Sequence, residues 1–380
     1  MDNSYFSNSK HIDDKTIGKL EELAEQMLFI QDNYEISFDF IEKALLMYIT
    51  NAKHTELSDN ISKVKIIKKW EVISTALDFY KSIDNKMYEK VRDVIFNQDK
   101  KTRFNIYRLS DIKNFDEMDF EFNKFSRYSY SAINHVLDNK DFIYVPIKCG
   151  WEYNEKLSEQ LGKDNATIED LYTIVHELAH TFDVYLDCVI NADKRIISDI
   201  YDYNFFLTES NAIAFEELLT DFLLKTGKIN NEKEVEERFV NRKKYTIHKA
   251  YLTYARLVLA RKLKENECIK KEDIEEILWT LKIKDYLKEV FIYELIYLRN
   301  ENFIIDVGYA ISGVFSPTIE KVLNNGELEK YRKFLDASRR GDFSRAINIL
   351  GIEEDEKGIE VLEKNLGIKT KQIEDNIEER

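Results

Sequence analysis

The sequence predicts a mainly α-helical fold, and three observations lead to that expectation. The chain has 380 residues but only 2 prolines and 11 glycines, so few residues interrupt its regular elements. Hydrophobic residues make up 44% of the chain, which is enough for a sizeable core. Several long segments also repeat apolar residues at intervals of three and four, which is the period of an amphipathic helix.

The first 140 residues are expected to form an N-terminal helical region. A clear helical stripe lies within residues 15–30, and similar patterns follow at 38–49, 64–83 and 88–96. The aromatic residues of this region are interpreted as core rather than ligand-binding residues: Tyr34, Phe38, Phe40, Trp70, Phe79 and Tyr80.

Two later segments, 103–109 and 142–148, are rich in β-forming residues and predict short strands. We expect these strands to form a small β-sheet beside the helix that follows them, as one wall of a cleft. An exposed edge of such a sheet could pair with an extended peptide.

That helix carries the most informative motif of the chain, His176-Glu177-Leu178-Ala179-His180. Residues four apart on a helix share a face, so both imidazoles can reach one metal ion while Glu177 lies beside them as a proton acceptor. Apolar residues at helical spacing indicate that another face of the helix is buried. Thr167 with Asp170 predicts its N-terminal cap. A chance match on a polar helix face is the alternative.

A second amphipathic helix is predicted at 207–224, and its acidic residues are the candidates for a third ligand. Catalytic zinc sites use three protein ligands and leave one position open. Glu209 and Glu216 are seven residues apart and share a face. We take Glu209 as the third ligand, the alternative being that these acids are solvated.

Ligand histidines are commonly oriented by a hydrogen bond to their second ring nitrogen. Asp183, almost one turn after His180, and Glu216 are the candidates for this role. The alternative for each is a solvated surface acid.

The remainder of the chain also predicts helices. Residues 231–264 read as one long helix, and 270–299 as one or two more. Gly308 and Gly313, which flank Tyr309, are interpreted as points at which a loop could move. The basic residues of the long helix are interpreted as a solvated face: Lys243, Lys244, Arg256, Arg261 and Lys262.

Several stretches resemble a known family of zinc peptidases. Residues 166–180 resemble the active-site helix of oligoendopeptidase F, and Thr208-Glu209 with 215–220 resembles the third-ligand helix, with the same gap of seven between glutamates. The family is the thimet oligopeptidase-like metallopeptidases. Looser similarities to its preceding strand and its C-terminal helices lie at 142–147, 331–335, 341–343 and 346–352.

The resemblance implies a gluzincin-type catalytic domain over residues 141–380, made of helices with a small β-sheet beside the active-site helix, after the helical region 1–140. It implies one Zn²⁺ per chain, bound by His176, His180 and Glu209, with Glu177 as the general base. The implied activity is hydrolysis of peptide bonds, chiefly in short peptides.

The sequence departs from the family pattern in three respects. Ala179 stands where the family usually has glycine, and Asp183 where it often has histidine. A histidine and tyrosines that hold the reaction intermediate are replaced, at or near their positions, by Arg299, Ile305 and Val307. The stabilising group is therefore unassigned, and its candidates are His248, Tyr297 and Tyr309.

Composition narrows the possible partners. The net charge of −15 disfavours binding to nucleic acid. No apolar run approaches the roughly 18 residues of a membrane span, and the first residues lack the pattern of a signal peptide. The 3 cysteines are scattered and form no CxxC pair. We therefore expect a cytoplasmic protein whose partner is a peptide, rather than nucleic acid or a membrane.

Two alternatives to a short-peptide peptidase stay open. The short N-terminal region suggests a dedicated protease for one protein or precursor peptide. The unmatched histidine and tyrosine positions suggest a catalytically weak binding protein that kept the fold. The intact motif together with Glu209 favours an enzyme over the second alternative.

Overall fold

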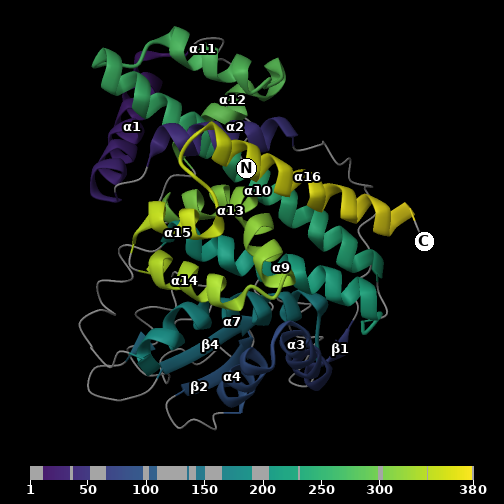
Figure 1. Ribbon diagram of the computed structural model, residues 1–380. Helices are drawn as coiled ribbons and strands as arrows, with labels where there is room; N and C mark the ends of the chain where they lie inside the picture. The colour runs from purple at the N-terminus through teal and green to yellow at the C-terminus, as the bar shows by residue number, and fades with distance from the viewer. Residues whose placement is uncertain are drawn as a thin grey trace, which may run out of the picture. The chain divides into compact units, whose positions relative to one another are not determined.

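The computed structural model describes residues 12–34, 37–51, 66–96, 102–108, 135–136, 143–149, 165–190, 205–229, 232–297, 303–339 and 341–378. Over these residues the chain is mainly helical, as expected (Figure 1). None of the helices it describes is both long enough and apolar enough to cross a membrane.

The chain divides into two compact units, each assembled from distant parts of the sequence. Unit 1 comprises Met1–Lys53, Tyr245–Val314 and Gly351–Arg380, and unit 2 comprises His54–Lys244 and Phe315–Leu350. The expected boundary between residues 140 and 141 therefore lies inside unit 2. The reason is that both ends of the chain contribute helices to unit 1, so its contacts do not follow sequence order.

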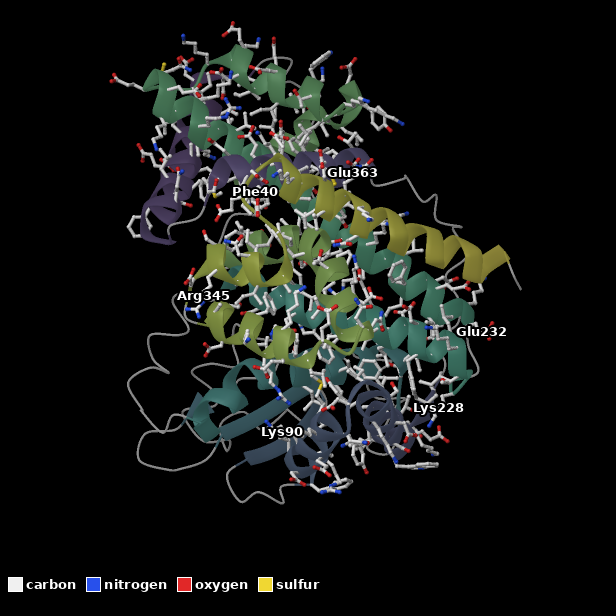
Figure 2. The ribbon with its side chains drawn as sticks, in the orientation of Figure 1. Phe40, Lys90, Lys228, Glu232, Arg345 and Glu363 are labelled. Atoms are coloured by element: carbon white, nitrogen blue, oxygen red, sulfur yellow. The ribbon has the colours of Figure 1, made fainter. Side chains whose placement is uncertain are left out.

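The regular elements described in unit 1 are all helices. Its complete elements are α1 (Asp14–Tyr34), α2 (Phe38–Asn51), α11 (Lys271–Thr280), η3 (Asp285–Leu287), α12 (Lys288–Tyr297) and α16 (Glu356–Glu378). It also holds the later part of α10 (Glu232–Asn266) and the first part of α13 (Phe303–Asn324). α2 packs against α16, and there Asn51 donates a 3.0 Å hydrogen bond to Glu363 (Figure 2).

Two expectations in unit 1 are corrected by its packing. Gly308 and Gly313 lie inside the helix α13, not in a loop. A Cβ atom at Gly313 would come within 2.5 Å of the Tyr48 ring, so this glycine lets an aromatic residue approach the helix backbone. Arg256 does not lie on a solvated face either, because it is fully buried and faces Asp306.

Unit 2 contains the described β-structure and the helices that carry the motif. Its complete helices are α3 (Lys69–Ile83), α4 (Asn85–Ile95), α7 (Ile168–Ile190), α9 (Phe205–Thr226), α14 (Leu328–Arg339) and α15 (Phe343–Leu350). The first part of α10 and the later part of α13 complete it. Phe79 and Tyr80 of α3 are core residues as expected, whereas Trp70 is 67% exposed, because it lies on the outer side of the first turn.

The two predicted strands are confirmed and pair with each other. β2 (Thr102–Arg108) pairs in parallel with β4 (Ile143–Cys149), and β3 (His135–Val136) pairs antiparallel along the first two residues of β4. A second ladder joins β1 (Ile67–Lys68) to β5 (Asn165–Ala166), directly before α7. β4 contacts α7, so the three-stranded sheet lies beside the helix with the motif, as predicted.

Candidate metal centre

A capping box fixes where α7 begins. The backbone N–H of Asp170 donates to Thr167 Oγ1 at 3.3 Å, and the backbone N–H of Thr167 donates to Asp170 Oδ2 at 2.7 Å. This reciprocal pair satisfies two of the backbone donors that a helix start leaves without partners. The predicted cap is therefore confirmed, and it lies a little more than two turns before His176.

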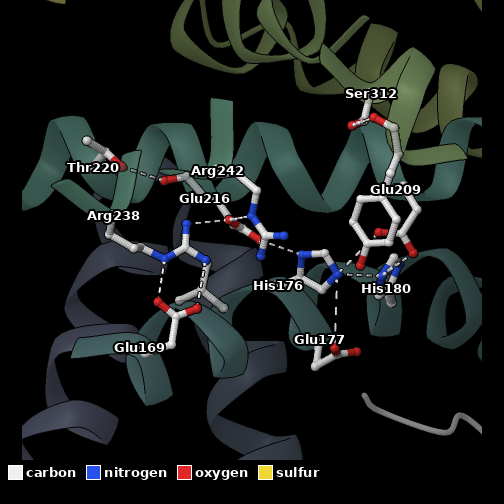
Figure 3. A network of polar contacts seen from close by, with 12 residues as sticks. Glu169, His176, Glu177, His180, Glu209, Glu216, Thr220, Arg238, Arg242 and Ser312 are labelled. Atoms are coloured by element: carbon white, nitrogen blue, oxygen red, sulfur yellow. Dashed lines mark hydrogen bonds and ion pairs between the residues drawn. The ribbon is translucent and has the colours of Figure 1, made fainter. Parts of the chain in front are cut away.

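Packing then sets the rotation of α7 about its axis. Its apolar residues at helical spacing are buried, among them Leu171, Val175 and Leu178. Tyr80 of α3 donates a 3.0 Å hydrogen bond to the carbonyl oxygen of Val175. With these sides of the helix fixed, His176 and His180 project toward α9, where Glu209 lies (Figure 3).

Three donor groups from α7 and α9 converge on one point. The Nε2 atoms of His176 and His180 are 3.1 Å apart. Glu209 places Oε2 at 3.4 Å from Nε2 of His176 and Oε1 at 3.5 Å from Nε2 of His180. The structure therefore brings together the three residues predicted as ligands, although 29 positions separate His180 from Glu209 in the sequence.

These distances fit a tetrahedral metal ion. Zinc binds imidazole nitrogen and carboxylate oxygen at about 2.0–2.1 Å, so two of its ligand atoms in a tetrahedron are separated by about 3.3–3.4 Å. The separation of 3.1 Å between the two Nε2 atoms lies close to that value, and so does the distance from each histidine to a Glu209 oxygen, 3.4 Å to Oε2 for His176 and 3.5 Å to Oε1 for His180. Two imidazoles and one carboxylate are also a ligand set that zinc commonly takes.

Glu177 lies beside this group but is the weaker candidate for a ligand. One ligand atom from each of His176, Glu177 and His180 lies within 4.8 Å of the others. Its Oε1 atom is 4.0 Å from Nε2 of His176, further than either oxygen of Glu209 is from its nearest imidazole. Glu177 is buried, with 3% of its surface exposed, next to the point on which the ligands converge. This placement suits a proton acceptor better than a ligand.

Glu216 orients His176 from the opposite side of the ring. Its Oε1 atom is 2.7 Å from Nδ1 of His176 (Figure 3). Donation from Nδ1 leaves the lone pair of Nε2 directed at Glu209 and His180, as metal binding requires. Glu216, expected as one of two candidates for this contact, makes it in the structure.

Two arginines that the sequence did not single out hold Glu216 in turn. Arg238 donates to Oε2 at 2.6 Å, while Arg242 donates to Oε2 at 2.9 Å and to Oε1 at 3.0 Å. Arg238 also binds Glu169 through two nitrogens, at 3.0 and 3.2 Å. The sequence does show that the two arginines are four residues apart on a predicted helix, which follows two helices that carry acidic residues. That spacing does not indicate which acidic residue the arginines bind.

The charges of this cluster shift the pKa values of its members in opposite directions. Burial works to lower the pKa of His176, but hydrogen bonds to Glu209 and Glu216 outweigh it and raise the pKa to about 10. Burial lowers the pKa of His180 to about 4. Burial would raise the pKa of Glu216, yet Arg238 and Arg242 hold it well below its usual value. The carboxylates around His176 therefore favour a positive charge on or beside that ring, whereas burial keeps His180 neutral.

A count of formal charges gives the same result. The contacts of the cluster join four carboxylates, those of Glu169, Glu177, Glu209 and Glu216, to the guanidinium groups of Arg238 and Arg242. Counted over these described contacts alone, the carboxylates exceed the guanidinium groups by two, and one divalent cation beside neutral imidazoles would balance that difference. Buried charge of this size is expensive unless it is compensated.

The structure describes only some of the other residues that the sequence predicted for the site. Asp183 and Tyr297 belong to α7 and α12, but their side chains fall outside the described part of the chain, as does the whole of Arg299. His248 and Tyr309 belong to unit 1. There Nε2 of His248 is 3.6 Å from Glu294, and the Tyr309 ring packs edge-on against Tyr245. Their role in stabilising an intermediate stays a prediction.

The chain was also compared with known proteins. No protein-family model, no curated protein and no solved structure matches it.

Proposed function

We propose that the chain is a zinc-dependent metalloendopeptidase of the thimet oligopeptidase-like type, with a gluzincin arrangement of ligands. The observation that carries the proposal is the convergence of His176, His180 and Glu209, with separations of 3.1 to 3.5 Å, beside the buried Glu177. Among the described contacts of the surrounding cluster, carboxylates outnumber guanidinium groups by two, which supports a divalent ion at this point.

Each residue then has a defined part. His176, His180 and Glu209 would hold the metal, and Glu216 fixes the tautomer of His176. Bound zinc supplies a Lewis acid that polarises a carbonyl group and makes a water molecule acidic near neutral pH. Glu177 accepts the proton of the attacking water and delivers it to the leaving nitrogen.

Short peptides are the proposed substrates. The sheet beside α7 offers strand edges to which an extended peptide can add by backbone hydrogen bonds, in a manner largely independent of sequence. Such binding suits an enzyme that cleaves many peptides, whereas a dedicated protease would require further contacts to one partner.

The test compares purified wild type with Glu177→Gln for zinc content and for turnover of a fluorogenic peptide library. We expect about one zinc per chain in both proteins. We expect turnover in the wild type and a loss of about 10² to 10⁴-fold in the variant, the usual contribution of a general base. Zinc without turnover in the wild type would favour a dedicated protease or a binding protein, and absence of zinc would refute the metal site.

A further inference from the structure

We propose that Arg238 and Arg242 are positioning residues for the metal ligand His176, acting through Glu216. The inference rests on the proposed function, since it concerns how one of the proposed ligands is held. Neither arginine contributes an atom to the group on which the ligands converge. Their contribution is to fix the one carboxylate that orients the imidazole.

The first argument is the saturation of Glu216 by donors. Its Oε1 atom accepts from Nδ1 of His176 at 2.7 Å and from Arg242 at 3.0 Å, while Oε2 accepts from Arg238 at 2.6 Å and from Arg242 at 2.9 Å. A carboxylate with four donors cannot rotate without losing several charge-assisted bonds. The ring of His176 is thereby fixed through its Nδ1 atom.

The second argument is that Arg238 is itself immobilised by the helix that it helps to position. Two of its nitrogens bind Glu169 in the first turn of α7, and its guanidinium lies 3.8 Å from the centroid of the Tyr172 ring. The Tyr172 hydroxyl is 2.8 Å from Thr220 Oγ1 on α9. The arginine pair of α10 thus ties the helix of His176 to the helix of Glu209.

The third argument is chemical, because these contacts need arginine. The planar guanidinium presents donors in a fixed fork, which Arg242 uses across both oxygens of Glu216. A lysine at the same position would offer a single point charge. The conservative substitution is therefore informative.

The first experiment measures zinc affinity, by competition with a chromophoric chelator, together with the absorption spectrum of the cobalt-substituted protein. We expect Arg242→Gln to weaken zinc binding by about 10 to 100-fold, the usual effect of losing a partner that orients a ligand, and to change the cobalt spectrum. Arg242→Lys should recover part of the loss. Lys233→Gln is the matched control, since Lys233 lies on the same helix, has a 60% exposed side chain and, in the described part of the chain, pairs along the helix with Glu237. It should leave both measurements unchanged.

The second experiment asks whether Arg242 acts through Glu216. In the background of Glu216→Gln, the further change Arg242→Gln should alter zinc affinity by less than about twofold, because the intermediary is already gone. Equal losses in both backgrounds would overturn the inference, as would unchanged affinity and spectrum in Arg242→Gln. If the circular dichroism spectrum shows that Arg242→Gln is unfolded, the zinc affinity and cobalt spectrum of Arg242→Lys test the inference in its place. If replacing His180 left zinc binding unchanged from the wild type, the metal site itself would be refuted. That outcome is distinct from a failure of the inference about Arg242.

Discussion

The two units each bury a charged cluster, but the two clusters have opposite charge balances. In unit 2, four carboxylates face two guanidinium groups around the paired imidazoles of His176 and His180. In unit 1, Asp306 faces two cations, with Lys249 at 2.6 Å and Arg256 at 3.7 Å. Among these described contacts, carboxylates outnumber cationic side chains in the first cluster, and cationic side chains outnumber carboxylates in the second.

The difference shows that burial of charge does not by itself mark a metal site. Arg256 is fully buried, and burial lowers its pKa to about 10 despite the nearby Asp306. The contacts described for Asp306 join it to an ammonium and a guanidinium group and include no imidazole. What distinguishes the cluster of unit 2 is that its carboxylates outnumber its guanidinium groups while two imidazole nitrogens are directed at one point.

The largest expected effect concerns metal binding. Glu209→Ala should reduce zinc content from about one per chain to less than about a tenth, because two imidazoles alone hold zinc weakly. Asp306→Asn, which changes the cluster of unit 1, should leave zinc content unchanged. Metal analysis of both purified variants checks the comparison, and equal losses in the two proteins would contradict it.

The next effect concerns stability. Glu216→Gln removes the partner of two buried guanidinium groups and should lower the free energy of unfolding by about 3–5 kcal/mol. Asp306→Asn removes a less saturated carboxylate and should cost about 1.5–3 kcal/mol. Urea denaturation of the two variants beside the wild type tests this order, which the reverse ranking would refute.

A third effect concerns pH in the presence of a metal chelator. His176 has a folded pKa of about 10 against an ordinary 6.5, so its contribution is complete below pH 6.5 and is lost as the pH rises toward 10. His180 has a folded pKa of about 4, so stability is also lost as the pH falls below 6.5 toward 4. Unfolding midpoints should therefore peak near the ordinary imidazole pKa.

His176→Gln is the control for the alkaline side of this profile. It should flatten the decline above pH 6.5, because the group whose proton stabilises the fold is absent. An alkaline decline of the same slope in this variant would assign the effect to other residues.

The smallest expected effect concerns packing rather than charge, and it lies in unit 1. Gly313→Ala forces a Cβ atom against the Tyr48 ring and should cost about 1–3 kcal/mol. Gly18→Ala, in α1, meets nothing within 4 Å and should instead stabilise the chain by up to about 1 kcal/mol. Thermal melting of the two variants should show shifts of opposite sign.

Local patterns in the sequence predicted much of this structure. The cap formed by Thr167 and Asp170, the helices of the motif and of Glu209, and the strands at 102–108 and 143–149 follow from signals within a few residues. The spacing of Glu209 and Glu216 also indicated a shared face, and the structure turns that face toward His176.

The features that escaped prediction depend on partners far away in the sequence. Arg238 and Arg242 gain their meaning only when α10 packs beside α7 and α9, and no local pattern specifies that packing. Gly313 resembles a loop residue until Tyr48, 265 positions earlier, is seen against it. Trp70 has a large aromatic side chain of the kind usually found in a core, but its position in the first turn of α3 leaves it exposed.

The contacts of the candidate metal centre, from Glu169 to Arg242, lie within one continuous stretch of 74 residues. By contrast, unit 1 joins Lys43 to Glu356 and Asn51 to Glu363, across more than 300 residues. All residues of the candidate metal centre precede Tyr245, so they are synthesised before the later segments of unit 1. Short loops close sooner and at lower entropic cost than long ones. We therefore expect the contacts of the candidate metal centre to close before these two contacts of unit 1, although unit 2 as a whole also needs Phe315–Leu350.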